Sequence, residues 1–139
     1  MKKRVVITGL GVVSPNGVGI SAFSEALKKG VSGIEFLPEL RDLNFSCQLG
    51  ASPKISEEKK RKYLSDLQLR NFNSNGILYG VIAGMDALKD AKITPAKPDE
   101  EPLWDLGIIF GTGISGVDKF REAIHKIDNK NVRRLGSTS

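Results

Sequence analysis

The sequence is poor in the features that mark several large classes of protein. Its single cysteine, Cys47, cannot form an internal disulfide and gives no spacing typical of a metal site. No apolar run approaches the roughly 18 residues that a membrane-spanning helix needs, and aromatic residues make up only 6% of the 139 residues. We therefore predict one globular domain, or a piece of a larger one, in the cytoplasm, with no metal site and no membrane partner.

Positive charge is in modest excess, and it is unevenly placed. The net charge is +5, and basic residues gather at residues 2–4, 59–62 and 133–134. A nucleic-acid-binding protein usually combines such clusters with aromatic residues or a known module, and the sequence shows neither. We predict no nucleic-acid partner. A solvated face, or contact with an acidic or phosphate-bearing partner, are the two interpretations left open.

Short β-branched runs alternate with helical patterns along the chain, which is typical of an α/β protein. Ser21 and Ser56 are the expected N-cap residues of two helices, because a serine side chain can accept a hydrogen bond from the first turn. Strands are expected over residues 4–10, 45–51 and 105–110, and helices over residues 21–29, 56–62, 73–91 and 117–127.

The helix expected over residues 73–91 is unusually rich in small residues. Its interior glycines, Gly76, Gly80 and Gly84, each cost roughly 1 kcal/mol relative to alanine. Close packing against another backbone would offset that cost. A helix that is apolar on nearly every side is also expected to be buried, here between layers that this short chain supplies only in part.

The stretch GTGISG, Gly111 to Gly116, has the G-x-G-x-x-G pattern of dinucleotide-binding loops, and it lies between an expected strand and an expected helix. Such a site also needs an acidic residue about 20 positions later, at the end of a strand. Asp128 has that spacing, but residues 125–134 do not have a strand pattern. We therefore predict no cofactor, and we interpret the glycines as permitting a sharp reversal of the chain.

Three stretches together resemble the elongating condensing enzymes of the thiolase superfamily, the β-ketoacyl-acyl-carrier-protein synthases, and most closely the type II synthases. The stretches are RVVITGLGVVSPNG (residues 4–17), ILYGVIAGMDALKDAKI (77–93) and GIIFGTGISG (107–116). The resemblance implies a thiolase-like fold, an αβαβα layered sandwich, of which residues 1–139 would be the N-terminal portion. It also implies that the complete protein is a homodimer.

The resemblance implies a 3-oxoacyl-acyl-carrier-protein synthase, which condenses malonyl-carrier protein with an acyl thioester, with loss of carbon dioxide, in fatty-acid or related polyketide synthesis. Its expected partners are acyl carrier protein and these thioesters. The family's cysteine and histidines fall beyond the point that matches Ser139, so no catalytic residue is expected in this chain, which alone should be inactive. We expect Cys47 to be a small buried side chain and His125 to lie at the surface or an interface.

The same resemblance implies roles for five residues. Ile114 matches the residue that gates the acyl tunnel, with a core position as the alternative, and Gly113 and Gly116 let the loop pass close to it. Arg133 and Arg134 match a basic pair that docks the carrier protein, with a solvated pair as the alternative. The sequence departs from the family because its longest basic run lies at residues 59–62, rather than directly before the buried helix.

Two other functions are weighed against this one. A non-catalytic partner resembling the chain-length factors would share everything visible in these residues. An NAD(P)-dependent oxidoreductase would require a strand that ends near Asp128.

Overall fold

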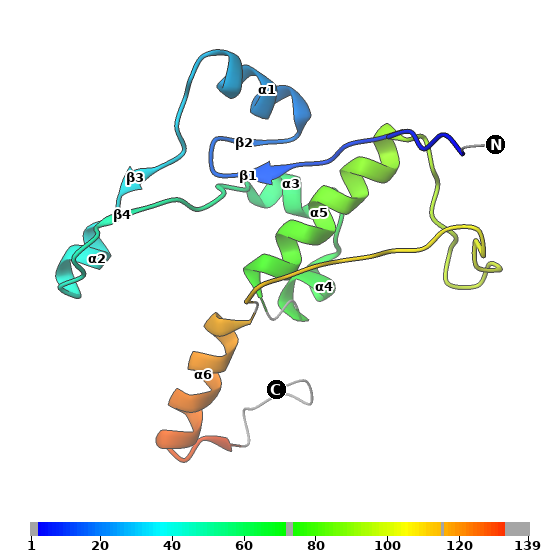
Figure 1. Ribbon diagram of the computed structural model, residues 1–139. Coiled ribbons are helices and arrows are strands. Elements are labelled where there is room, and N and C mark those ends of the chain that lie inside the picture. Colours follow the sequence, from blue (N-terminus) through cyan, green and yellow to red (C-terminus); the bar gives the residue numbers. More distant parts are fainter. Residues whose placement is uncertain (1–2, 72–73, 115, 133–139) are drawn as a thin grey trace.

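The computed structural model describes residues 3–71, 74–114 and 116–132, and it combines helices with short hairpins (Figure 1). The strands are β1 Val13–Ser14, β2 Gly17–Val18, β3 Glu35–Phe36 and β4 Leu49–Gly50. The helices are α1 Ile20–Lys28, α2 Pro38–Asp42, α3 Glu57–Arg61, α4 Asp66–Asn71, α5 Asn75–Asp90 and α6 Val117–Asp128.

Both sheets in the described part of the chain are two-stranded and antiparallel. β1 pairs with β2 across a turn in which the Ser14 hydroxyl donates to the Gly17 carbonyl at 2.9 Å. β3 pairs with β4, so the strand expected over residues 45–51 forms only at Leu49–Gly50.

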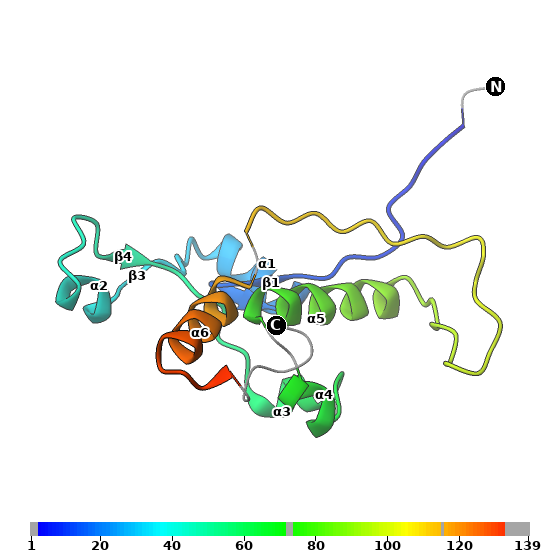
Figure 2. The ribbon, with the colours of Figure 1, turned by 90° about the horizontal axis from the view of Figure 1, so that it is seen from below.

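The strands expected over residues 4–10 and 105–110 are not formed. Segment 105–110 runs beside α5, whereas segment 4–10 meets the end of α5 and extends away from it toward the N-terminus (Figures 1 and 2). Neither segment has a ladder partner among the described residues. An extended segment becomes a strand only when a neighbour takes up its backbone hydrogen bonds. The prediction was therefore wrong about strand hydrogen bonding. The apolar side chains of these segments are also left uncovered by the described residues, since Val5 is 94% exposed and Ile109 is fully exposed.

All four expected helices are present, with small shifts at their ends. Ser56 caps α3 as predicted, because its hydroxyl accepts from the Lys59 N–H at 3.2 Å. Ser21 does not cap α1, which begins at Ile20 after Gly19 with φ of 91°. The short helices α2 and α4 were not predicted, since five or six residues are too few to show a helical period.

The core is small and is built around α5. Leu64, Leu78 and Ile82 are buried together, and five half-buried residues pack against them: Val13, Ile55, Tyr63, Leu69 and Val81. Figure 1 shows α5 at the centre, with the other elements arranged around it. The described residues thus form a mixed helix and sheet arrangement, and the five-layer sandwich stays a prediction.

Small residues let two segments come close to α5. A Cβ on Gly9 would lie 2.5 Å from the Ala91 nitrogen, and one on Gly80 would lie 2.8 Å from a ring carbon of Phe110. Of the interior glycines of α5, only Gly80 is closely packed, since a Cβ on Gly76 or Gly84 would come no nearer than 3.7 Å to an atom outside the helix. At Gly80 the neighbour is the Phe110 ring rather than another backbone. Another backbone does approach α5 elsewhere, because residues 9–11 pack against Ala83, Ala87 and Ala91.

Candidate functional site

The glycine loop, which we define as residues 111–114 together with Gly116, connects the extended segment 105–110 to α6. Gly116 is the N-cap residue of α6 and has φ of 76°, in the left-handed region. A side chain at this position would strain the backbone, so glycine is required where the chain turns into the helix. The prediction of a glycine-dependent turn is confirmed at Gly116 but not at Gly111 and Gly113, which do not have a positive φ.

Ile114 lies on the outer surface of this loop. Its side chain is 84% exposed, so it packs into no core among the described residues. A Cβ on the neighbouring Gly113 would meet nothing within 4 Å. Both residues are therefore open to a partner or a ligand.

A cavity of about 370 Å³ lies between the first half of α5 and the loop. Neither Ile114 nor Gly113 lines it. The lining is almost entirely apolar and consists of Gly76, Ile77, Gly80, Val81, Phe110, Gly111 and Thr112. No motif in the sequence indicates this cavity, although the four-residue spacing of Gly76 and Gly80 places an open stripe on one face of α5.

Ser74 joins the loop to α5. Its hydroxyl accepts a hydrogen bond from the Gly116 N–H at 3.2 Å, and the residue is only 6% exposed. This contact could not be predicted from the sequence either. A serine directly before a helix is expected to cap that helix, and nothing in the sequence shows that it bonds instead to a residue 42 positions away.

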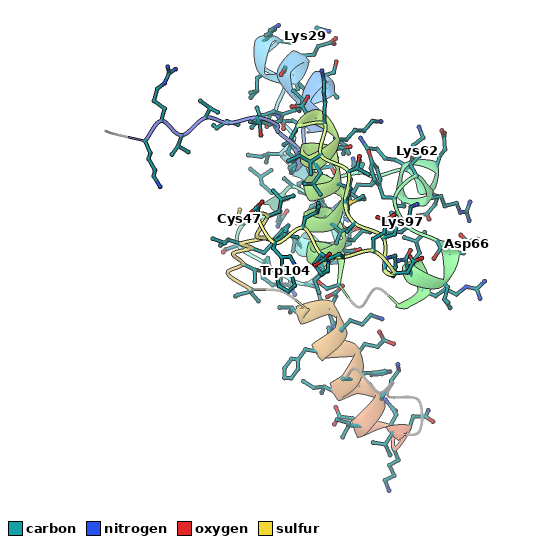
Figure 3. The ribbon with its side chains drawn as sticks, turned by 90° about the vertical axis from the view of Figure 1, so that its right-hand side faces the viewer. Lys29, Cys47, Lys62, Asp66, Lys97 and Trp104 are labelled. Carbon is teal, nitrogen blue, oxygen red and sulfur yellow. The ribbon has the colours of Figure 1, made fainter. Side chains whose placement is uncertain are left out.

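The basic run at residues 59–62 is paired within the described structure. Lys60 lies 2.6 Å from Glu57, Arg61 lies 3.0 Å from Asp66, and Lys62 lies 3.5 Å from Glu58. Figure 3 shows Lys62, directly after α3, and Asp66, at the start of α4. This run is therefore a weaker attractant for an acidic partner than its sequence suggests. The expected docking pair, Arg133 and Arg134, lies outside the described residues.

Asp86 on α5 is the centre of a half-buried polar cluster. The Tyr63 hydroxyl donates to one of its oxygens, and the Lys59 Nζ lies 3.6 Å from the other. The hydrogen bond to Asp86 raises the pKa of Tyr63 to about 12, with burial and the carboxylate charge adding to the effect. The cluster ties the segment from α3 to Tyr63 onto the central helix.

Helix α6 carries an exposed ion-pair network. Glu122 lies 2.7 Å from both Lys119 and Lys126, and hydrogen bonds from these two lysines lower its pKa to about 2. His125 is exposed, in agreement with its predicted surface position. Asp128 ends this helix rather than a strand, so the acidic group that a dinucleotide site requires is not in place.

Cys47 is exposed, which corrects the prediction of a buried side chain (Figure 3). It lies in the connection between β3 and β4, two residues before β4, and no described residue covers its thiol. Among residues 3–71, 74–114 and 116–132, no group of three or more histidine, cysteine or carboxylate side chains could hold a metal ion. Within the same ranges, no helix is long and apolar enough to cross a bilayer.

Comparison with known proteins assigns the family. The N-terminal domain of beta-ketoacyl synthases matches residues 2–138. The chain belongs to the beta-ketoacyl synthase family. It is 31% identical over 96% of its length to the chloroplastic 3-oxoacyl-[acyl-carrier-protein] synthase I of Arabidopsis thaliana. It is 30% identical over 96% of its length to 3-oxoacyl-[acyl-carrier-protein] synthase 2 of Vibrio cholerae.

This member of the beta-ketoacyl synthase family covers only part of each relative. It spans 28% of the Arabidopsis protein and 31% of the Vibrio protein. The glycine loop, Ser74 and α5 all fall inside the matched residues 2–138.

Proposed function

We propose that this chain is the N-terminal portion, residues 1–139, of a 3-oxoacyl-acyl-carrier-protein synthase. The enzyme would condense malonyl-carrier protein with an acyl thioester in fatty-acid or related polyketide synthesis. The observation that carries the proposal is the family match over residues 2–138, together with relatives whose names state this activity. The complete enzyme would be a cytoplasmic homodimer with the thiolase-like αβαβα sandwich.

The direct test is a condensation assay on the complete gene product. It should form 3-oxoacyl-carrier protein from malonyl-carrier protein and an acyl thioester, with release of carbon dioxide. Product formed only after addition of a second ketosynthase subunit would favour the non-catalytic partner instead. Absence of product under both conditions would refute the proposal.

In this enzyme, the glycine loop would shape the acyl site, with Ile114 as the gate and Gly113 and Gly116 allowing the loop to lie close to the substrate. Support comes from the 84% exposure of Ile114 and the open space around Gly113. Ile114 is exposed, although it does not line the cavity between α5 and the loop.

If Ile114 gates the acyl site, a larger side chain there should change the length of acyl chain that the enzyme prefers. Ile114→Phe in the complete enzyme should shorten the acyl chains that it accepts, because the larger ring fills space beside the substrate. The measurement is kcat/KM for a series of saturated acyl primers. An unchanged chain-length profile would contradict the gating role of Ile114 but not the proposed condensation activity.

Carrier-protein docking would use Arg133 and Arg134. An acyl carrier protein is acidic and bears a phosphate-linked arm, which guanidinium groups bind well. Reversing both residues to glutamate should raise KM for carrier-protein substrates more than for coenzyme A substrates. Equal effects on the two substrate classes would indicate a folding defect and would count against docking at this pair.

A further inference from the structure

Ser74 occupies the N-cap position of α5 but does not cap that helix. The residue has the extended backbone of an N-cap, with φ of −155° and ψ of 136°, yet its side chain makes no hydrogen bond to the first turn of α5. A serine at this position ordinarily accepts from the second or third N–H of its own helix. Its hydroxyl is therefore engaged elsewhere.

That engagement is the hydrogen bond from the Gly116 N–H, which is 3.2 Å from the Ser74 oxygen. Gly116 is itself the N-cap residue of α6, and no side chain caps that helix either. One hydroxyl thus joins the starts of two helices, and Figure 1 shows α6 running away from the beginning of α5. The contact is shielded from water, since Ser74 is only 6% exposed.

The glycine loop has few other restraints. Gly111 and Gly113 have open space where a Cβ would lie, and Ile114 is 84% exposed. Phe110, directly before the loop, is held on Gly80 and Gly84 of α5. Phe110 and Gly116 are therefore the two ends at which the described structure fixes the loop to α5.

We propose that Ser74 is a positioning residue: its bond to Gly116 holds the loop that carries Ile114 at a set distance from α5, and so helps to determine which acyl chains are accepted. The inference rests on the proposed function and extends it to a residue outside the loop. Ser74 does not touch the substrate, and it acts through the backbone of Gly116.

The first test measures the hydrogen bond itself. In the complete protein, Ser74→Ala should accelerate amide hydrogen exchange at Gly116 about fivefold, which corresponds to loss of one hydrogen bond of about 1 kcal/mol. Ser74→Thr keeps the acceptor and should restore slow exchange. Ser56→Ala removes the serine cap of α3 and is the matched control, with no expected effect at Gly116. Unchanged exchange at Gly116 in Ser74→Ala would overturn the inference.

The second test separates positioning from a general structural role. Ser74→Ala should change the ratio of kcat/KM between short and long acyl primers about threefold or more, whereas Ser56→Ala should not. If Ser74→Ala is too unstable to assay, Ser74→Gly removes the hydroxyl while keeping a residue that N-cap positions accept.

The outcomes are distinguishable. Faster exchange at Gly116 with an unchanged primer ratio would overturn positioning but leave the proposed function intact. A changed ratio in Ile114→Phe but not in Ser74→Ala would likewise count against Ser74 alone. A wild-type protein that condenses no primer would refute the proposed function and the inference with it.

Discussion

Tyr63 and Lys59 meet on opposite oxygens of one half-buried carboxylate, that of Asp86. Their side chains come from the charged segment around α3, and Asp86 belongs to the central helix. At the scale of single residues, this cluster is a polar link that anchors the α3 segment to α5. Its strength should therefore appear in the stability of the protein.

Tyr63→Phe should lower the free energy of unfolding by about 1 kcal/mol at neutral pH, because it removes a hydrogen bond to a charged acceptor that is partly open to water. Urea denaturation measures this change. Tyr79→Phe, on α5 itself, is the matched control, since the Tyr79 hydroxyl is not a partner of Asp86. Equal losses in the two variants would contradict a specific role for the cluster.

The same contact gives a pH dependence of known sign. The pKa of Tyr63 is raised from 10.0 to about 12 in the folded protein, so the folded state holds this proton more tightly than the unfolded state. The stabilisation is complete below pH 10 and is lost as the pH rises toward 12. In Tyr63→Phe the unfolding free energy should fall less steeply over this window than in wild type.

At the scale of elements, the small residues of α5 act as a surface on which extended segments rest. Gly9 and Gly11 approach the face formed by Ala83, Ala87 and Ala91, and the ring of Phe110 covers Gly80. The glycine content of the region lowers its helix propensity but permits these contacts. Added side-chain volume here should therefore be costly.

Gly11→Ala should destabilise the protein by about 1–3 kcal/mol, because its Cβ would collide with the Ala83 carbonyl and lie 2.7 Å from the Ala87 nitrogen. Gly107→Ala, in the second extended segment, is the matched control, since its Cβ would meet nothing within 4 Å. Midpoints of urea denaturation compare the two. A larger loss at Gly107 would show that the described packing does not govern stability.

At the scale of the whole molecule, apolar surface is left open along the two extended segments and on α6. Ile7 and Ile108 are each 81% exposed, and Phe120 on α6 is 68% exposed. Exposed apolar patches of this kind mark surfaces that other polypeptide covers. The curated relatives are about three times as long as the matched region, which is consistent with such a cover.

The isolated 139-residue chain should therefore bind a hydrophobic dye strongly and self-associate, and it should show no condensation activity. Dye fluorescence, sedimentation velocity and the carrier-protein assay are the three measurements. Measurable condensation by this chain alone would contradict the expectation that it holds no catalytic residue. A monomer that does not bind the dye would contradict the reading of its surface.

Much of the local structure could be predicted from the sequence. Helical periodicity located α1, α3, α5 and α6, and the GTGISG stretch placed Gly116 at a turn. The positions of Cys47 and of the expected strands could not be predicted. An apolar alternating pattern shows that a segment can be buried, but not whether a neighbour is present to bury it.

By itself, the sequence determined the family, the main helices and the glycine that precedes α6. These features depend on local patterns and on the order of the family motifs along the chain. Only the tertiary structure decided that Ser74 bonds to Gly116 rather than to its own helix, that the 59–62 run is paired, and that Ile114 faces outward. Each of these depends on which distant residue lies within about 4 Å, a distance that is set by packing and leaves no pattern in neighbouring residues.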